Sequence, residues 1–254
     1  MILNYKVSGS GFPVVILHGF LGSLDNWQSI ANQLSTYFTT YTFDLRNHGR
    51  SGHTDSNSYE DMSNDVAETI QQLGIEKLHL IGHSMGGKVA MRFALDFPHL
   101  VEKLVVVDIS PRKYNRHHDS VFEAMFAVDL KAIHSRGEAE IQMSKVIDDK
   151  PTKQLLLKSL ERQPDGSYEW KMNLDVLYEQ YEEIVKPIEA DHAVPIETLI
   201  IKGGKSRYIN ENDLPLFSAL FPKNQLVTIP EAGHWVHAEA PREFLEASLA
   251  FLQS

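Results

Sequence analysis

The residues of this chain best suited to covalent chemistry begin with a serine between two glycines. Residues 82–86 read Gly-His-Ser-Met-Gly, a match to Gly-x-Ser-x-Gly, which places a serine at a sharp turn between a strand and a helix. The glycines remove side chains that would clash, and the turn holds the serine in a strained conformation with its hydroxyl exposed. Apolar residues precede the motif and recur at helical spacing up to Pro98. The pattern therefore predicts a nucleophile at Ser84.

A serine hydroxyl needs a base to take its proton and a third group to hold that base in one tautomer. Where the serine stands in such a turn, the acid and then the histidine follow it along the chain. His234 follows a glycine in the loop after the last expected strand, and we predict that it is the base. His237 is the rival, which we expect to line the mouth of the site or to begin the next helix.

The third member of the triad is predicted at Asp108. The loop after the next-to-last strand, where the acid often lies, reads Gly-Gly-Lys-Ser-Arg over residues 203–207 and has no carboxylate; Ser206 stands where an Asp would be expected. Asp108 ends the strand after the serine's helix, at the same edge of the sheet. A turn-capping role is its alternative. Asp213 and Glu211 remain candidate acids, although carboxylates at a helix start often serve only as caps.

Two backbone amides are expected to stabilise the negative oxygen of a tetrahedral intermediate. One belongs to Met85, directly after the serine, and the other to Phe20, in the loop after the first parallel strand. The candidate substrate contacts are His18, Arg46, Asn47, His83, Trp235 and His237. Structural roles compete for several of them, because His18 can tie its loop together and Arg46 with Asp44 can hold a solvated loop.

These residues need a frame that brings the ends of several strands together. Short apolar patterns typical of buried strands occur at residues 14–17, 39–43, 77–81, 104–107, 197–202 and 225–229. Helical patterns separate most of them, which predicts an α/β fold with a mostly parallel sheet and helices on both faces. We expect residues 2–7 and 14–17 to form an opening hairpin. Residues 44–52 are expected to be a polar loop too charged to lie in the core.

Residues 112–186 interrupt the alternation of strands and helices. Helical patterns follow one another at residues 119–130, 137–147, 152–162 and 173–185. Residues 163–167 have the composition of a turn. The helices need the rest of the chain to bury their apolar faces, so we interpret residues 112–186 as a helical insertion. Residues 1–111 and 187–254 then form the core.

Composition narrows the classes of function. The chain has 254 residues, 43% of them hydrophobic, and a net charge of -10, which disfavours binding to nucleic acid or an anionic membrane surface. No apolar run approaches a membrane span or a secretory signal, so we expect a cytoplasmic protein. The lack of cysteine excludes a thiolate nucleophile and a cysteine metal site. We expect no cofactor and no metal, and a monomer or homodimer.

Four motifs in order carry a family resemblance. They are residues 46–49 (Arg-Asn-His-Gly), 82–88 (Gly-His-Ser-Met-Gly-Gly-Lys), 107–111 (Val-Asp-Ile-Ser-Pro) and 233–239 (Gly-His-Trp-Val-His-Ala-Glu). With them the chain resembles the α/β-hydrolase fold family, more closely the small bacterial esterases of the YbfF type, and more distantly mitochondrial abhydrolase-domain proteins. The resemblance implies an acid at Asp108, an auxiliary hydrogen-bonding role for Ser206, and a cap over the site formed by the insertion.

The leading hypothesis is a serine esterase or thioesterase that acts on a small acyl ester or thioester through an acyl-enzyme on Ser84. A serine at this position argues against epoxide opening and halide displacement, which use an aspartate there. Carbon-carbon bond hydrolases and perhydrolases use the same triad and remain open. A hydrolase-fold protein that binds a small ligand under its cap, with slow turnover, is the alternative outside these enzyme classes.

Overall fold

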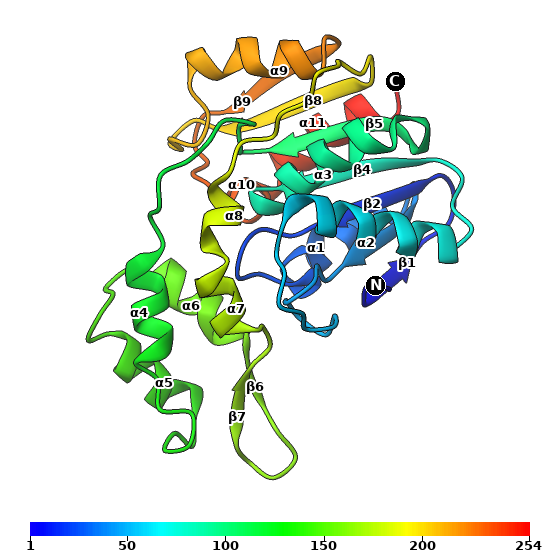
Figure 1. Cartoon of the computed structure of the whole chain (residues 1–254). Coiled ribbons are helices and arrows are strands. Elements are labelled where there is room, and N and C mark those ends of the chain that lie inside the picture. Colours follow the sequence, from blue (N-terminus) through cyan, green and yellow to red (C-terminus); the bar gives the residue numbers. More distant parts are fainter.

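Figure 1 shows the computed structural model, which describes the backbone of residues 1–254 and every side chain except that of Pro151. Its central sheet has seven strands in the order β1-β3-β2-β4-β5-β8-β9. In chain order the strands are β1 (Tyr5–Ser8), β2 (Pro13–Leu17), β3 (Thr39–Phe43), β4 (Leu78–His83), β5 (Val101–Val107), β8 (Glu197–Gly203) and β9 (Asn224–Ile229). β1 is antiparallel to β3, and the other pairings are parallel. The carboxyl ends of six strands therefore meet at one edge.

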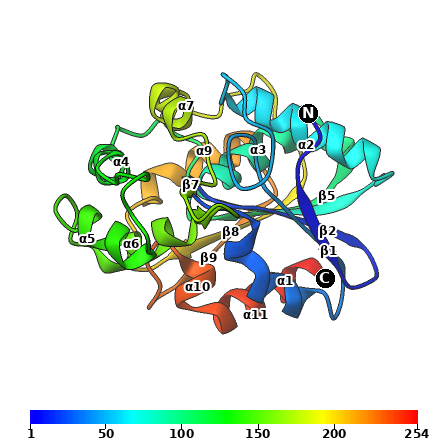
Figure 2. The same cartoon turned by 90° about the horizontal axis from the view of Figure 1, so that it is seen from below.

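Helices cover both faces of this sheet, as predicted (Figure 2). They are α1 (Gln28–Leu34), α2 (Tyr59–Gln72), α3 (Met85–Asp96), α9 (Leu214–Leu220), α10 (Val236–Glu239) and α11 (Pro241–Leu252), with short 3-10 turns at Leu24–Trp27, Pro98–Leu100 and Glu211–Asp213. Side chains alternate between the two faces along each strand. On β2, Val15 and Leu17 join the apolar cluster that includes α2 and α3, whereas Val14 and Ile16 join the cluster that includes α1 and α11.

The segment between β5 and β8 lies to one side of the sheet (Figure 1). Its elements are α4 (Asp119–Phe126), α5 (Arg136–Met143), α6 (Lys150–Lys158), β6 (Leu160–Arg162), β7 (Tyr168–Trp170), α7 (Leu174–Glu179) and α8 (Tyr181–Val185). Its apolar residues, among them Phe122 and Tyr181, are buried in the same cluster as α2 and α3. The segment is thus mostly helical and packs against the rest of the chain; its division from the core at residues 112 and 186 stays a prediction.

Two predictions for the amino-terminal region are wrong. β1 does not pair with β2 in a hairpin but lies at the far side of β3, where Tyr5 is opposite Phe43. The sheet gains one antiparallel edge strand because β2 is already bonded on both sides, to β3 and β4. The charged loop after β3 is not solvated, since residues 44–48 are all buried. Asp44 is satisfied there by the backbone N-H groups of Leu24 and Arg50, at 2.8 and 2.9 Å.

The inserted segment differs from prediction in its details. β6 and β7 form a small antiparallel hairpin around the expected turn, where a helix was expected to continue to residue 162. The last expected helix is split into α7 and α8 at Gln180. Short strands of three residues give too little periodicity to separate them from a helix end.

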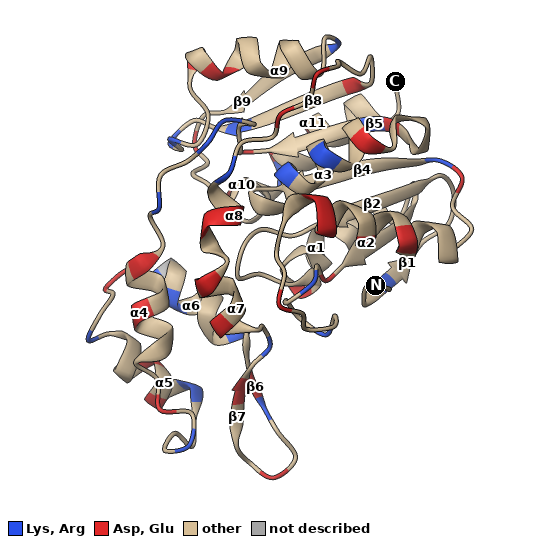
Figure 3. Ribbon diagram, in the orientation of Figure 1, with Lys and Arg blue, Asp and Glu red and all other residues tan. Residues whose placement is uncertain are grey.

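Acidic and basic residues are interspersed along both the sheet and the inserted segment (Figure 3). Among the described residues, no helix is long and apolar enough to cross a membrane.

Candidate active site

Ser84 lies at the turn from β4 into α3, with a left-handed backbone conformation of φ 53° and ψ -121°. Such an angle is strained for a residue with a side chain. The turn is possible because glycines flank it at close range. A Cβ on Gly82 would collide with the carbonyl group of Gly86, and a Cβ on Gly86 would lie 2.5 Å from the carbonyl oxygens of Leu17 and His18. The absence of side chains at Gly82 and Gly86 therefore allows the serine turn to pack closely on the end of β2.

The structure brings Ser84, His234 and Asp108 into one hydrogen-bonded line. The Ser84 hydroxyl lies 3.0 Å from Nε2 of His234, and Nδ1 of His234 lies 2.8 Å from Oδ2 of Asp108. With the imidazole proton on Nδ1, His234 donates to the carboxylate and Nε2 is free to accept the serine proton. The Asp108 side chain is fully buried, whereas 19% of the His234 side chain is exposed.

Asp108 also receives hydrogen bonds from the loop that lacks a carboxylate. The backbone N-H of Gly203 donates to Oδ1 at 3.0 Å, and the Ser206 hydroxyl donates to Oδ2, the oxygen that also accepts from His234. The backbone N-H of Tyr208 donates in turn to Ser206 at 3.2 Å. Because β5 and β8 are neighbours, an acid at the end of β5 reaches the space next to the β8 loop. The end of β5 and the loop after β8, the two places considered for the acid, are thus parts of one hydrogen-bonded network.

Four neighbouring strands of the sheet are each followed, at or within four residues of their carboxyl end, by a residue with a strained backbone conformation. Leu21, Asn47, Ser84 and Asp108 have φ angles of 58°, 61°, 53° and 49°, and they follow β2, β3, β4 and β5 respectively. These angles favour glycine, so their occurrence in residues with side chains indicates that surrounding contacts hold the loops in place. Strain of this kind is concentrated at functional sites.

The amides of Phe20 and Met85 remain available for a ligand. Across the residues that the structure describes, neither N-H donates a hydrogen bond to a protein acceptor. The loop holding Phe20 passes close to the serine, since a Cβ on Gly19 would lie 3.3 Å from Cβ of Ser84. Both amides therefore meet a requirement for the predicted oxyanion site.

A cavity of about 320 Å³, counting its part open to solvent, lies beside Ser84. Its lining comes from both the sheet edge and the inserted segment: Phe20, Tyr59, Ser84, Met85, Ile109, Tyr114, His117, His118, Tyr181, Ile184, Val185 and Tyr208. Burial, followed by the nearby His117 and His234, lowers the pKa of His118 to about 3, so its imidazole is neutral at pH 7. The cavity wall is thus largely apolar and aromatic.

Sequence reasoning missed Tyr208, which lies on the candidate base. Its ring stacks on that of His234 with centroids 3.8 Å apart and planes 16° from parallel. Its hydroxyl hydrogen-bonds to Nε2 of His117 at 2.7 Å, which links the inserted segment to the β8 loop. The only sequence signal was its position two residues after Ser206 in the same loop. An aromatic residue in a loop has no periodicity that would reveal its target.

Three candidate substrate contacts are committed to other partners. His18 donates from Nδ1 to the Gly19 carbonyl at 2.8 Å and accepts the Leu45 N-H at Nε2, at 3.0 Å, so it ties two loops together as the structural alternative predicted. Arg46 forms two hydrogen bonds to Asp65, at 2.6 and 3.0 Å. Asn47 is fully buried and accepts from the Thr54 N-H. The lining of the cavity beside Ser84, as described, includes none of the three.

The other candidate contacts lie around the base. His83 is buried, and its Nε2 donates to the His234 carbonyl at 2.9 Å. Burial, then the neighbouring His234 and His237, lowers the pKa of His83 well below its usual value. His237 is the second residue of α10, where it is buried and stacked on Trp27 at 4.0 Å; the start of a helix is one of the two places expected for it. Trp235 is half-buried and borders a separate hollow against α6.

The alternative acids are occupied elsewhere. Asp213 is buried against Arg112, at 3.1 Å, and accepts from the Asn210 N-H. Glu211 is exposed in the same 3-10 turn. Neither hydrogen-bonds to His234 among the described residues. The turn-capping alternative for Asp108 is also weakened, because its carboxylate contacts the β8 loop and His234 instead.

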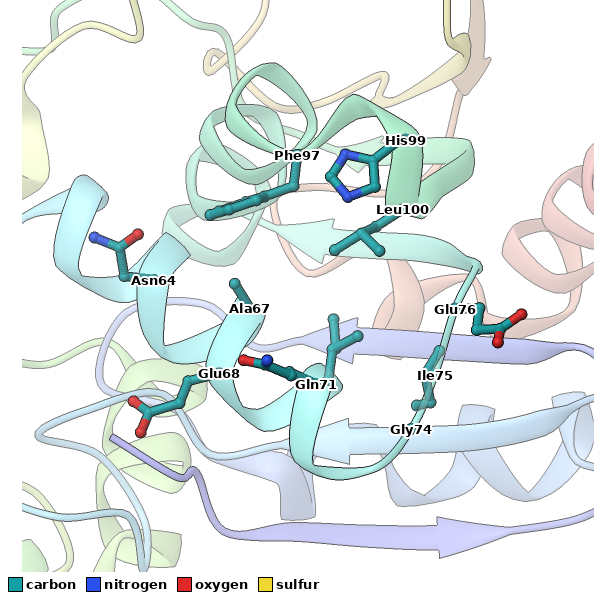
Figure 4. A pocket seen from close by; sticks show the side chains of 11 residues that line it. Asn64, Ala67, Glu68, Gln71, Gly74, Ile75, Glu76, Phe97, His99 and Leu100 are labelled. Carbon is teal, nitrogen blue, oxygen red and sulfur yellow. The ribbon is translucent and has the colours of Figure 1, made fainter.

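A wider hollow lies at the opposite end of the strands (Figure 4). It is lined by the end of α2, the approach to β4 and the turn before β5, including Glu68, Gln71, Phe97 and His99. In open α/β sheets ligands bind at the carboxyl ends of the strands, and this hollow is at the amino ends. No group of three or more metal-ligating side chains suited to an ion occurs in the part of the chain that the structure describes.

Comparison with known proteins gives concordant matches. The family model described as alpha/beta hydrolase fold matches residues 13–241. The sn-1-specific diacylglycerol lipase ABHD11 of Danio rerio is 41% identical over 262 residues, which cover 99% of this chain and 82% of that protein. Esterase YbfF of Escherichia coli is 38% identical over 244 residues, 94% of this chain and 92% of that one. A solved structure titled marine microorganism esterase superposes with a TM-score of 0.96 at 43% identity, over 98% of this chain and 99% of that chain.

Proposed function

The chain belongs to the α/β-hydrolase fold family, as its motifs predicted, and is a hydrolase of the esterase and lipase class; on this premise we propose that it cleaves carboxylic esters through an acyl-enzyme on Ser84. The observation that carries the proposal is the hydrogen-bonded line from Ser84 through His234 to Asp108, with the serine among the residues that line a cavity. This arrangement can perform both acylation and deacylation with one base.

In acylation, Oγ of Ser84 attacks the ester carbonyl carbon while Nε2 of His234 takes the hydroxyl proton. The bond to the leaving oxygen then breaks, and His234 returns that proton to the departing alcohol. In deacylation, a water molecule attacks the acyl carbon, its proton passes to His234, and the serine leaves with that proton while the carboxylic acid is released. Asp108 stabilises the imidazolium formed in both steps and stays ionised.

Three further groups complete the proposed site. The N-H groups of Phe20 and Met85 donate to the oxygen that becomes negative in each tetrahedral intermediate, a contact worth about 3 kcal/mol per donor in other serine hydrolases. Ser206 is an auxiliary residue that holds Asp108 through its hydroxyl. Because Ser206 donates to the oxygen that also binds His234, it fixes the carboxylate in the plane that the base requires.

The cavity supports a substrate with a small acyl group. The empty space beside Ser84 is small, about 320 Å³ even with the part that is open to solvent, and Phe20, Ile109 and Val185 give it apolar walls. Residues 112–186 act as a cap that supplies much of this wall. Thioesters are a second proposed substrate class, because a thiol leaving group needs less proton transfer from His234 and the acyl cavity is the same.

The proposal is tested with a fluorophosphonate probe and a panel of p-nitrophenyl esters and acyl thioesters of graded chain length. We expect labelling at Ser84, multiple turnovers with short acyl chains, and a loss of kcat of roughly 10⁵- to 10⁶-fold in Ser84→Ala. Retained turnover in Ser84→Ala would contradict the nucleophile assignment.

The same experiment separates the alternatives. A binding protein of this fold would be stabilised against unfolding by the ester without multiple turnovers. A carbon-carbon bond hydrolase or a perhydrolase would be labelled at Ser84 and yet turn over simple esters poorly, and would then be assayed with vinylogous diketones or with hydrogen peroxide as the acyl acceptor.

A further inference from the structure

Lys88, on the helix that begins after Ser84, is a buried cation without a carboxylate partner. Its side chain is 1% exposed, and within the described part of the chain it takes part in no ion pair. Its Nζ donates to the backbone carbonyl of Arg112 at 2.9 Å and to that of Lys186. Such a buried ammonium is costly, so its retention next to the nucleophile calls for a function.

The two carbonyls that Lys88 binds lie on the two connections between the sheet and the helices α4 to α8. Arg112 lies on the exit from β5, and Lys186 directly follows α8. These two segments, residues 111–114 and 184–188, are here called the hinge. They are bonded to each other, since the Tyr114 N-H donates to Val185 at 2.9 Å and the Ile188 N-H donates to Pro111 at 2.7 Å. Lys88, on the helix that begins after the nucleophile, therefore contacts both segments of the hinge.

The hinge also forms a wall of the cavity beside Ser84. Tyr114, Ile184 and Val185 line the cavity. The ring of Tyr114 lies 4.9 Å from the Lys88 ammonium, and the ring of Tyr59 lies 5.6 Å from it. Tyr59 adds a second tether, because its hydroxyl donates to the Ile184 carbonyl at 2.6 Å. Any shift of the hinge thus changes the width of the cavity directly.

A second buried lysine, Lys103, binds backbone carbonyls away from the cavity and serves as a comparison for Lys88. Lys103 on β5 is 6% exposed, and its Nζ donates to the carbonyls of Phe251 and Ser254 at 2.8 and 2.7 Å. It also lies near the carboxylate of Glu197, at 3.6 Å, whereas the charged neighbour of Lys88 is the guanidinium of Arg112. Burial, and then Arg112, lowers the pKa of Lys88 to about 7. The Lys88 ammonium is therefore buried next to another cation, and its N-H groups bind the two backbone carbonyls there.

We propose that Lys88 is a positioning residue that fixes both segments of the hinge to the nucleophile helix and thereby sets the width of the cavity beside Ser84. This inference rests on the proposed esterase function for its kinetic test, although its structural part stands on the hydrogen bonds alone. Lys88 does not touch the reacting atoms, and its effect passes through Tyr114, Ile184 and Val185. Its loss should relax chain-length selectivity while the triad persists.

The test replaces Lys88 by methionine, which has a similar length and no donor. In Lys88→Met the buried carbonyls of Arg112 and Lys186 lose their donor. We expect KM for the preferred short-chain ester to rise about tenfold, which corresponds to about 1.4 kcal/mol, with kcat changed less. The ratio of kcat/KM for octanoyl over acetyl esters should rise at least several-fold. Amide hydrogen exchange should become faster in residues 111–114 and 184–188.

Lys103→Met is the matched control, since it removes a buried lysine of the same kind from the other side of the sheet. It should lower stability to urea and leave both chain-length selectivity and exchange in the hinge as in the wild type. If Lys88→Met does not fold, Tyr59→Phe removes the second tether alone and should shift selectivity in the same direction by a smaller factor.

Unchanged selectivity and unchanged hinge exchange in a folded Lys88→Met, or in Tyr59→Phe where the first variant does not fold, would overturn the inference. Equal changes in Lys103→Met would also overturn it, because they would reveal a general loss of stability. Failure of the proposed function looks different: the wild type would then not be labelled by fluorophosphonate, and hinge exchange would still report on Lys88 without any turnover.

Discussion

Two neighbouring regions at the carboxyl edge of the sheet carry similar polar residues and use them in opposite ways. The loop after β3 holds Asp44, Arg46 and His48, whose partners lie inside the protein: Asp44 accepts backbone N-H groups, Arg46 pairs with Asp65, and Nε2 of His48 accepts the Leu21 N-H at 3.3 Å. This region is a closed polar network. It fixes the loop and leaves little for a ligand.

The line of Ser84, His234 and Asp108 is open at one end. Asp108 is satisfied by His234, Gly203 and Ser206, whereas among the described residues the Ser84 hydroxyl has His234 as its one partner, and Ser84 lines the cavity. The difference shows that residue type is a weak guide to chemistry at this edge. What matters is whether the fold already satisfies the hydrogen-bonding capacity of a side chain.

The largest expected effect is on kcat, and it comes from replacing Asp108, the buried member of the line of Ser84, His234 and Asp108. In Asp108→Asn the amide cannot hold His234 in the tautomer with Nε2 free, so kcat should fall by about 10⁴-fold. Acylation rates measured by stopped flow with a p-nitrophenyl ester check this. Asp213→Asn is the control: it removes a buried carboxylate nearby and should leave the acylation rate within a few-fold of the wild type. The reverse outcome would move the acid to Asp213.

A smaller effect, on stability alone, is expected in the closed network. In Arg46→Met the buried carboxylate of Asp65 loses its bidentate partner and keeps the Met1 ammonium, at 2.7 Å, which should cost about 1 to 3 kcal/mol of unfolding free energy. Urea unfolding measures the cost, and KM of the folded variant should stay as in the wild type. Arg242→Met, at an exposed pair, should change stability by less than about 0.5 kcal/mol. A raised KM in Arg46→Met would reinstate Arg46 as a substrate contact.

The smallest effect concerns His237, a buried histidine of α10 that takes no part in the line of Ser84, His234 and Asp108. Burial, then His234, lowers the pKa of His237 to about 3 from a usual 6.5. Between these values the unfolded chain binds a proton that the folded chain does not, so stability falls as the pH drops below 6.5. His237→Phe keeps the stack on Trp27 and should flatten this loss by about 1.4 kcal/mol per pH unit between pH 6 and 4.

Urea midpoints of the wild type and His237→Phe at pH 7, 6, 5 and 4 provide that measurement. Identical slopes in the wild type and His237→Phe would show that His237 is protonated in the folded state.

The strands, the serine turn and the loop of His234 could be predicted because their signals are local. A buried parallel strand is a short apolar run, and Gly82 and Gly86 are required by a turn whose neighbours leave no room for Cβ atoms. The position of Asp108 could be predicted because parallel strands end at one edge. The antiparallel place of β1 could not, since its pairing with β3 depends on which edge of the sheet is free.

The roles of other polar residues depended on contacts between distant segments. Arg46 lies in a segment whose composition is typical of a solvated loop. The fold brings Asp65 of α2 against it and buries the pair. Tyr208 gave no signal for its stack on His234. The hinge is a further case, because Lys88 lies within the serine motif while its partners Arg112 and Lys186 are far from it in the chain.

The sequence by itself determined the α/β frame and the candidate nucleophile and base, because backbone geometry forces glycine, apolar and breaker residues into fixed local patterns. Only the tertiary structure decided which polar groups are closed off and which face the cavity, and how the cavity is walled. Hydrogen-bond satisfaction and burial are properties of the whole packed chain. Whether the Ser84 hydroxyl is available for a substrate can therefore be seen only when the positions of all possible hydrogen-bond partners are known.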